Sequence, residues 1–338
     1  MDYSQHRLDY CEFLISSEIN YTQTYLADHS ETYSHDSMNR FLRLDKLTPR
    51  TLWENVRADV VVSEQGYGLF DDVVLDKRHS PQARLVRRQW SGNEKRVSYG
   101  IGVVTCVYVN PETGQFWVIN YRVYDPEGDE QSKINPRLEM IDKVLDSKKL
   151  PFTRVLMDSW YASMQVIKYI ESLGKIYYCP INTNRHVDDT EGEEKHKRVD
   201  KLSWTEEPTK GKTLQLKKMP KGHRMRLFRL AFSNERTDYV ITNDMTQDKA
   251  DVVKQPCGVR WKIEQFHREA KQVTGLEGCQ CRLSRALRNH IACSFLVWAH
   301  LKRLAKELNS NVYQLKFSLL DDYMKQQLKK PTYPMTLC

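Results

Sequence analysis

Several features that define other classes of protein are missing from this chain of 338 residues. No run of 18 apolar residues occurs, the mean hydropathy is −0.65, and the opening MDYSQHRLDY lacks the basic-then-apolar order of an export signal. Membrane spans and signal peptides are both built on continuous apolar segments. We therefore expect a soluble cytosolic protein that has no membrane partner.

The cysteines lack the spacing of a disulfide or zinc framework. Eight cysteines are scattered along the chain, and no C-x2-C pair is present. Scattered thiols fit a reducing compartment, and the missing pairs argue against a structural zinc site. The Cys and His residues that could otherwise suggest one are Cys257, His267, Cys279, Cys281, His290 and Cys293.

Charge is distributed unevenly. Residues 1–60 hold six Lys and Arg against ten Asp and Glu, a balance of −4 in a chain of net charge +8, which leaves +12 for the rest. The positive charge concentrates in 195–236 and 260–330. A basic body suits a polyanionic partner, although mildly basic proteins are common.

Residues 1–60 are expected to be helical and to contain a helix-turn-helix. A helix at 26–29, a turn at 31–33 and a second helix at 34–42 would bury Met38, Phe41 and Leu42, with Ser34 as the N-cap. The second helix of such a motif reads bases in the major groove. A plain helical packing domain is the alternative, and the acidic balance favours it. The residues expected to face outward are Ser37, Asn39 and Arg40.

The middle of the chain alternates strand and helix patterns. A short strand at 66–70 runs into an Asp pair, and residues rich in Val, Ile, Tyr and Phe at 96–110 and 116–125 predict a hairpin. A helix at 138–148, a buried strand at 154–157, a helix at 163–174 and a strand at 175–180 follow. This is the order of a ribonuclease H-like α/β core.

A β-rich insertion is expected to interrupt that core at 181–255, because 213–219, 225–233 and 238–244 have strand-like composition. Helices at 257–273 and around 290–308 would follow. The predicted organisation is a helical region at 1–60, the first part of the core at 61–180, the insertion at 181–255, a core helix and its successors at 256–310, and a C-terminal helical tail at 311–338.

The stretch CGVRWKIEQFHREAK at 257–271 predicts a helix with one functional face. Arg260 lies four residues before Glu264 and Lys271 seven after it, which places all three within roughly 40° of one face. The apolar residues at 263, 266, 270 and 273 form a separate stripe that can face a core. A carboxylate framed by cations suits phosphoryl transfer on DNA. An exposed helix with ordinary ion pairs is the simpler alternative.

Three acids occupy special positions in this order of elements. Asp72 ends the first strand, Asp158 ends a later strand, and Glu264 lies on the helix after the insertion. In a ribonuclease H-like topology these positions converge, and converging carboxylates repel unless they bind cations. Oxygen ligands suit Mg²⁺ or Mn²⁺, and two such ions can assist attack on a phosphodiester. Taken singly, Asp72 could be a turn residue and Asp158 a helix N-cap.

These motifs resemble those of cut-and-paste DDE transposases of bacterial insertion sequences, of the cyanobacterial type. Their signature is Tyr, two residues, Arg, three residues, Glu, six residues, Lys, and it matches Arg260, Glu264 and Lys271, with Cys257 at the tyrosine position. FDDVVLDK at 70–77 and LMDSWY at 156–161 resemble the first two catalytic blocks. Val73 stands where Thr or Ser usually follows, so Asp71 and Asp72 are alternative first ligands, and Asp72 is preferred.

The resemblance implies a nucleoid-associated bacterial enzyme that excises and reinserts its own mobile element. Asp72, Asp158 and Glu264 would hold two Mg²⁺ ions, replaceable by Mn²⁺. The partners would be double-stranded DNA, at the terminal inverted repeats and at the target, and a second copy of the chain in a dimeric synapse. A catalytically silent DNA-binding descendant and a ribonuclease H-like nuclease are the alternatives.

Further residues are candidate DNA contacts. In the insertion, Trp204 would stack on a flipped base, or else pack inside the protein. Solvated surface is the alternative for the basic residues next to the presumed site. The candidate phosphate contacts are Arg260, Lys271, Lys77, Arg78, Asn184 and Arg185.

Overall fold

A computed structural model describes residues 2–92, 96–125, 135–142, 147–190, 192–193, 196–204, 209–232 and 236–334 of the chain. The chain forms two compact units, each assembled from segments that are distant in sequence. Unit 1 comprises Met1–Asp59, Val73–Val103 and Gln265–Cys338, and unit 2 comprises Val60–Asp72 and Val104–Glu264.

The core of unit 2 is a mixed sheet whose strand order is that of a ribonuclease H-like fold. The order is β4-β3-β1-β5-β6, in which β5 pairs in parallel with both β1 and β6. Helix α6 (Met164–Ser172), capped by the Ser163 side chain, connects β5 to β6. The predicted order of core elements is therefore confirmed. The strands are β1 (Tyr67–Asp76), β3 (Arg96–Val109), β4 (Phe116–Val123), β5 (Arg154–Met157) and β6 (Ile176–Ile181).

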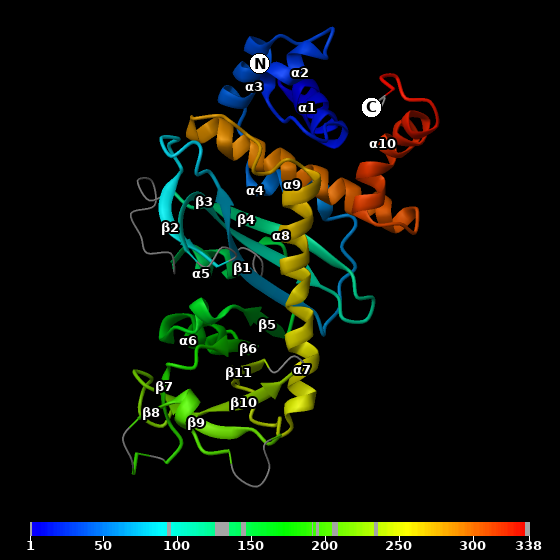
Figure 1. The fold of residues 1–338 in the computed structure, drawn as a ribbon. Helices are drawn as coiled ribbons and strands as arrows, with labels where there is room; N and C mark the ends of the chain where they lie inside the picture. Colours follow the sequence, from blue (N-terminus) through cyan, green and yellow to red (C-terminus); the bar gives the residue numbers. More distant parts are fainter. Residues whose placement is uncertain are drawn as a thin grey trace, which may run out of the picture. The chain divides into compact units, whose positions relative to one another are not determined.

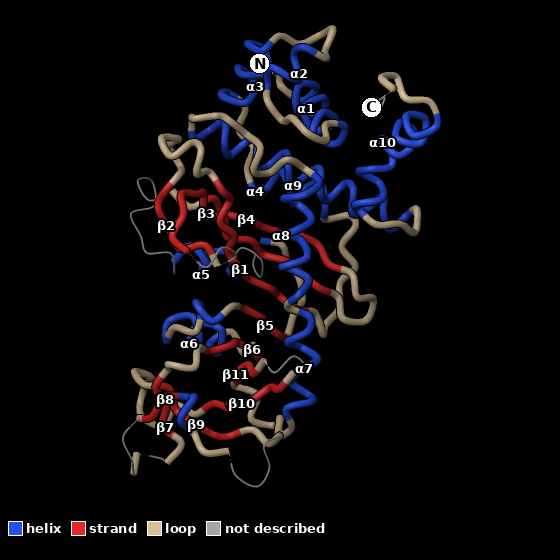
Figure 2. Tube along the Cα trace, viewed as in Figure 1, coloured by secondary structure: helices blue, strands red, loops and turns tan. Residues whose placement is uncertain are grey.

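The segment predicted as an insertion continues the same sheet. Strand β11 pairs antiparallel with β6, and β10, β9, β7 and β8 follow in that order (Figure 2). Leu227, Phe228 and Val240 of these strands are buried. The strands are β7 (His186–Asp188), β8 (Lys197–Arg198), β9 (Lys212–Leu216), β10 (Met225–Ala231) and β11 (Thr237–Thr242).

Unit 1 is built around the long helix α9 (Ser284–Glu307), against which the N-terminal helices pack (Figure 1). The Asn289 side chain on α9 donates to the carbonyls of Leu42 and Asp45, and the Tyr10 hydroxyl lies 2.9 Å from His290 Nδ1. Unit 1 also contains β2 (Arg87–Ser91), which pairs antiparallel with β3. Its other helices are α1 (Ser4–Ser16), α2 (Gln23–Asp28), α3 (His35–Leu44), α4 (Pro49–Val56) and α10 (Val312–Lys329).

The predicted second helix of the helix-turn-helix is α3. Ser34 caps it by accepting a hydrogen bond from the backbone N–H of Ser37, and Met38, Phe41 and Leu42 are buried, as expected. The first helix, α2, begins three residues earlier than predicted because Thr22 caps it. Whether α3 reads DNA remains a prediction.

Two predicted boundaries are wrong. The first strand does not stop at the Asp pair, because Val73 and Leu75 are buried and continue β1 to Asp76. The helix at 257–271 is divided into α7 (Ala250–Val259) and α8 (Trp261–Val273). Pro256 lies inside α7 and cannot donate a backbone hydrogen bond, and Arg260 N bonds to Cys257 O in a tighter turn.

Other predicted helices differ mainly in length. Helix α5 (Asn135–Asp142) begins before the predicted 138–148 helix, and residues 143–146 of that prediction lie outside the described residues. The apolar stripe of α8 is fully buried as predicted, at Ile263, Phe266, Ala270 and Val273. None of the helices in the described part of the chain has the length and apolar content to cross a bilayer.

Candidate active site

Asp71 and Asp158 meet where the parallel pairing of β1 with β5 ends. The last register pair is Phe70 with Met157, so the next residue on each strand is an aspartate. Residues that face each other in a ladder point to the same side of the sheet. Asp71 is therefore the carboxylate of β1 that shares a face with Asp158. Asp72, one residue on, belongs to the opposite face of a regular strand.

Asp72 is nevertheless connected to the same region. Its backbone N–H donates to Asp71 Oδ1 at 2.9 Å, and the hydroxyl of Tyr161 donates to its Oδ1 at 3.4 Å. Tyr161 ends the short 3-10 helix η2 (Ser159–Tyr161) that follows Asp158. The segment after the second aspartate thus holds the first aspartate pair.

Asp158 is not a capping residue, although it occupies the N-cap position of η2. Its side chain makes no capping hydrogen bond. Its carbonyl accepts from the Cys179 thiol of β6, which fixes the backbone at the strand end. The carboxylate is 34% exposed and lies 3.9 Å from Arg260 Nη1. The simpler interpretation as an N-cap is therefore excluded, and the side chain is available for chemistry.

Arg260 connects Asp158 to the third acid. Its Nη2 lies 2.7 Å from Glu264 Oε1, and the two side chains are 21% and 30% exposed. The turn between α7 and α8 places Arg260 where one guanidinium reaches both carboxylates. All of these residues belong to unit 2.

The neighbouring acids change the pKa of Asp71. Burial, and after it the negative charges of Asp72 and Asp158, raise the pKa of Asp71 to about 8, although Arg260 opposes the change. A carboxyl group with this pKa is protonated at neutral pH unless another cation joins the site. The cluster thus carries more negative charge than Arg260 alone neutralises.

The donor chemistry of this cluster fits a hard divalent cation. Several carboxylate oxygens at sheet and helix ends, under mutual repulsion, are the ligands that Mg²⁺ and Mn²⁺ prefer. In the arrangement described here, no three His, Cys, Asp or Glu side chains of the described residues converge on one point that could hold an ion. Glu264 is bonded to Arg260 instead, so a cation shared with the aspartates requires Glu264 to leave that guanidinium.

Two predicted phosphate contacts are engaged within unit 1. Lys271 Nζ lies 2.8 Å from Glu277 Oε1 and donates to Val74 O at 3.0 Å. Lys77 is buried and donates to the carbonyls of Glu277 and Cys279. The buried ammonium of Lys77 therefore supports the fold in this structure, and its contact with DNA stays a prediction.

The remaining predicted contacts lie in varied surroundings. Arg78 forms a 2.6 Å ion pair with Asp76. Arg185 donates to the carbonyl of Ala162, so it lies against the segment that follows Asp158, and Asn184 beside it is exposed. On α3, Arg40 is exposed, whereas Asn39 is half-buried.

Trp204 packs within the β-rich part of unit 2. Its ring centroid lies 6.2 Å from that of Tyr239 and 5.8 Å from Lys212 Nζ. The indole N–H is buried and has no acceptor among the described residues. The packing alternative describes its surroundings in this structure better than an exposed stacking platform does.

Sequence reasoning missed two aromatic side chains next to the acids. Trp160 follows Asp158 by two residues and is 71% exposed, and Trp261 precedes Glu264 by three and is 58% exposed. Large apolar side chains left in solvent beside a polar site often mark a binding surface. Both tryptophans lie within three residues of a predicted acid, and this proximity in sequence could have identified them.

The sequence matches a known protein family. Residues 69–299 match the family described as Transposase DDE domain, a match that spans more than half of the chain and contains all the acids above. The chain therefore belongs to this family, and it is a DNA transposase by descent. The family implies nuclease and transesterase activity, and DDE transposases generally use divalent metal ions. Among curated proteins, none matches the sequence.

Solved structures show only weak similarity. One is the cryo-EM structure of the piggyBac transposase synaptic complex with hairpin DNA, which is 16% identical, with 98% of this chain and 74% of that chain covered and a TM-score of 0.49. Another is the crystal structure of human ENDOV, 12% identical, with 76% and 98% covered and a TM-score of 0.29. Scores below 0.5 carry no conclusion about function.

Proposed function

We propose that this protein is a cut-and-paste transposase of a bacterial insertion sequence, of the cyanobacterial type with the Tyr-Arg-Glu-Lys signature. It cleaves double-stranded DNA at the terminal inverted repeats of its element and joins the ends to a target. The observation that carries the proposal is the cluster of Asp71, Asp158 and Glu264 around Arg260 within a chain of the transposase DDE family.

The proposed metal ligands are one aspartate of β1, Asp158 and Glu264. The register of β1 with β5 and the raised pKa of Asp71 favour Asp71 over Asp72 as the first ligand, contrary to the preference drawn from sequence. Two Mg²⁺ ions, replaceable by Mn²⁺, would supply an activated water or 3′-hydroxyl and stabilise the leaving oxygen.

The protein's own residues would prepare that chemistry. Arg260 holds Glu264 in place before metal binding and adds positive charge beside the scissile phosphate. Tyr161 orients Asp72, and the Cys179 thiol fixes the carbonyl of Asp158. Cys257 at the usual tyrosine position is half-buried, and burial raises the pKa of its thiol to about 12, so it stays protonated at neutral pH.

We further propose the division of labour drawn from the sequence. Residues 1–60 read the terminal repeats through Asn39 and Arg40, the core at 61–180 and 256–310 cleaves, the β-rich segment at 181–255 grips the transposon end, and 311–338 form a helical tail. Two copies of the chain assemble on paired ends, in the cell's nucleoid. Asn184, Arg185, Arg78 and Lys271 are proposed phosphate contacts, and Trp204 is proposed to stack on a flipped base.

The test is cleavage of DNA carrying the element's ends by a Glu264→Gln variant in Mg²⁺. We expect cleavage to fall below detection while duplex binding is retained. Asp251→Asn is the matched control, because Asp251 is an exposed carboxylate on the neighbouring helix α7. Cleavage by Glu264→Gln at the wild-type rate would refute the assignment. If the wild-type protein did not bind duplex DNA, the whole proposal would be excluded.

A further inference from the structure

Two adjoining cavities in unit 1 lie beside the N-terminal end of α9. One measures about 390 Å³ and lies between α2, α3 and the segment before α9. The other measures about 550 Å³ and is lined by the start of α4, by Arg84 and by the first turn of α9. Leu283 lines both, and the backbone N–H of Arg84 donates to Arg282 O, so the cavities form one continuous surface.

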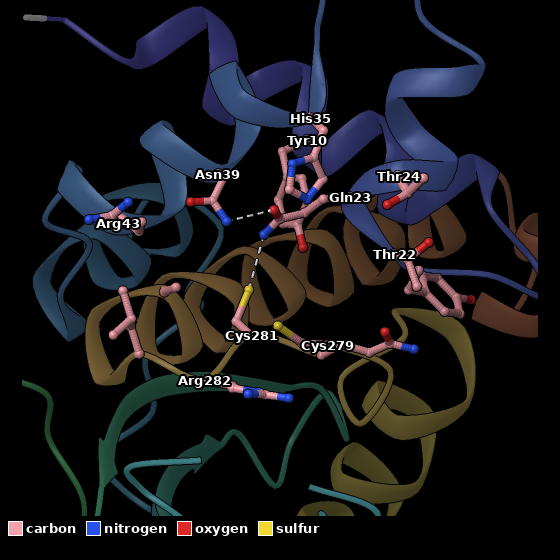
Figure 3. A pocket seen from close by; sticks show the side chains of 14 residues that line it. Tyr10, Thr22, Gln23, Thr24, His35, Asn39, Arg43, Cys279, Cys281 and Arg282 are labelled. Atoms are coloured by element: carbon pink, nitrogen blue, oxygen red, sulfur yellow. Dashed lines mark hydrogen bonds between the residues drawn. The ribbon is translucent and has the colours of Figure 1, made fainter. Parts of the chain in front are cut away.

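Arginine dominates this surface. Figure 3 shows Arg43 projecting from α3 on one side of the first cavity and Arg282 from the segment before α9 on another. No Asp or Glu lines either cavity within the described residues. We call this surface the arginine groove. Its basic residues are Arg43, Arg84, Arg282, Arg285 and Arg288.

Four of these five cations form no ion pair within the described part of the chain. Arg43, Arg84, Arg282 and Arg285 are exposed. Their guanidinium groups have no acidic partner among the residues that the structure describes. In contrast, the arginines elsewhere in unit 1 are often paired, such as Arg7 with Asp45 and Arg50 with Glu54. Like charges gathered without counter-charges favour an anionic ligand.

The helix that ends in the groove adds to this positive potential. Leu283 is the N-cap of α9 and offers no side-chain acceptor, and the first turn contains no acidic residue. The positive end of the dipole of this 24-residue helix therefore lies at the groove, which Leu283, Ser284 and Arg285 line. Arg285 and Arg288, three residues apart, extend the positive charge along one face of the helix.

We propose that the arginine groove binds the phosphate backbone of duplex DNA next to the bases contacted by α3. The inference rests on the proposed function, because that function supplies DNA as the ligand. Guanidinium groups match phosphate geometry, and contacts to phosphates position a protein on DNA without reading its sequence. Residues 1–60 carry a net negative charge, and at the arginine groove this charge is offset by arginines from the 77–87 and 282–288 segments.

The experiment measures binding of a fluorescent 40-bp duplex of random sequence to the full-length protein over a series of salt concentrations, in EDTA so that no cleavage occurs. Each lost phosphate contact lowers the salt slope by about 0.9 and the affinity by about eightfold at 0.1 M salt. We expect this for Arg285→Ala and for Arg84→Ala separately. Arg50→Ala is the matched control, because Arg50 is an exposed arginine of the same unit that lies outside the groove.

The outcomes separate the two proposals. Groove variants whose slope matches that of wild type and of Arg50→Ala would overturn the groove while leaving the transposase function standing. Equal losses in all three variants would also overturn it, since the effect would then be a general one of net charge. The far-ultraviolet circular dichroism melt of each variant establishes that it is folded. Failure of wild type to bind any duplex would overturn both proposals.

Discussion

The pH dependence of metal binding discriminates between Asp71 and Asp72 as the first ligand. In the metal-free protein the pKa of Asp71 is raised to about 8, first by burial and then by the charges of Asp72 and Asp158. A proton must leave before the carboxylate can bind an ion, so protons and metal compete. Metal affinity should therefore rise with pH up to the pKa and stay constant above it.

The size of the effect follows from the pKa. At pH 7 a group with a pKa of 8 is about nine-tenths protonated, and each pH unit below the pKa lowers the deprotonated fraction about tenfold. The apparent affinity for Mn²⁺ should accordingly rise about ninefold from pH 6 to 7 and about fivefold more from pH 7 to 8. An aspartate with its ordinary pKa near 3.8 would give no slope in this range.

Isothermal titration of Mn²⁺ into the DNA-free protein at pH 6, 7 and 8 measures this slope. Asp71→Asn should abolish tight Mn²⁺ binding. Asp72→Asn removes a negative charge next to Asp71, so the Mn²⁺ affinity should become constant at a lower pH than in wild type. Asp251→Asn on α7 controls for the lost charge. A flat wild-type affinity, or binding that survives Asp71→Asn but not Asp72→Asn, would refute the assignment of Asp71.

Three other substitutions test the remaining assignments. Lys271→Ala should lower the free energy of unfolding by about 1–3 kcal/mol in urea, because it removes the contacts with Glu277 and Val74, and should lower the salt slope of DNA binding by about 0.9, because it removes a proposed phosphate contact; an unchanged slope would exclude Lys271 from the DNA interface. Lys77→Met should also destabilise, by about 2 kcal/mol, because two carbonyls lose their donor; unaltered urea unfolding would contradict this. Arg40→Ala should cost about 1–3 kcal/mol of discrimination between end and random DNA in competition binding at one salt concentration, and undiminished discrimination would exclude Arg40 from base contact.

The acids could be located from sequence because each follows a pattern that local chemistry fixes. The buried run Val155 to Met157 stops where Asp158 begins, and the change from apolar to polar residues marks the end of the strand. The stripe of α8 at helical spacing likewise predicted which residues are buried, since the period depends only on helix geometry. These features need no knowledge of distant partners.

Pairing between distant segments was not available from sequence. The choice of Asp72 assumed that β1 ends at the Asp pair, whereas β1 continues to Asp76, and only the register with β5 shows which aspartate faces Asp158. Composition predicted strands within the 181–255 insertion, but it did not show that β11 hydrogen-bonds to β6. Strand partners are set by tertiary contacts that composition does not encode.

The packing of the N-terminal helices on α9 decides how their role in DNA binding can be tested. Deleting residues 1–60 would expose the buried face of α9, because α1, α3 and α4 all pack on that helix and Asn289 donates to the carbonyls of Leu42 and Asp45 at the end of α3. A loss of DNA discrimination after such a deletion would therefore report unfolding as readily as lost base contacts. Point substitutions of exposed α3 residues separate the two effects.

The acidic cluster and the arginine groove differ in charge, and we therefore expect them to have different roles in DNA binding. The cluster of Asp71, Asp158 and Glu264 carries more negative charge than Arg260 alone offsets, so without a bound cation it repels phosphate. The arginine groove has no acidic lining residue within the described part of the chain and attracts phosphate whether or not metal is bound. Duplex binding should hence persist in EDTA, whereas cleavage should not. If chelation abolished both together, the metal would be needed to hold DNA, and the groove could not be the main source of affinity.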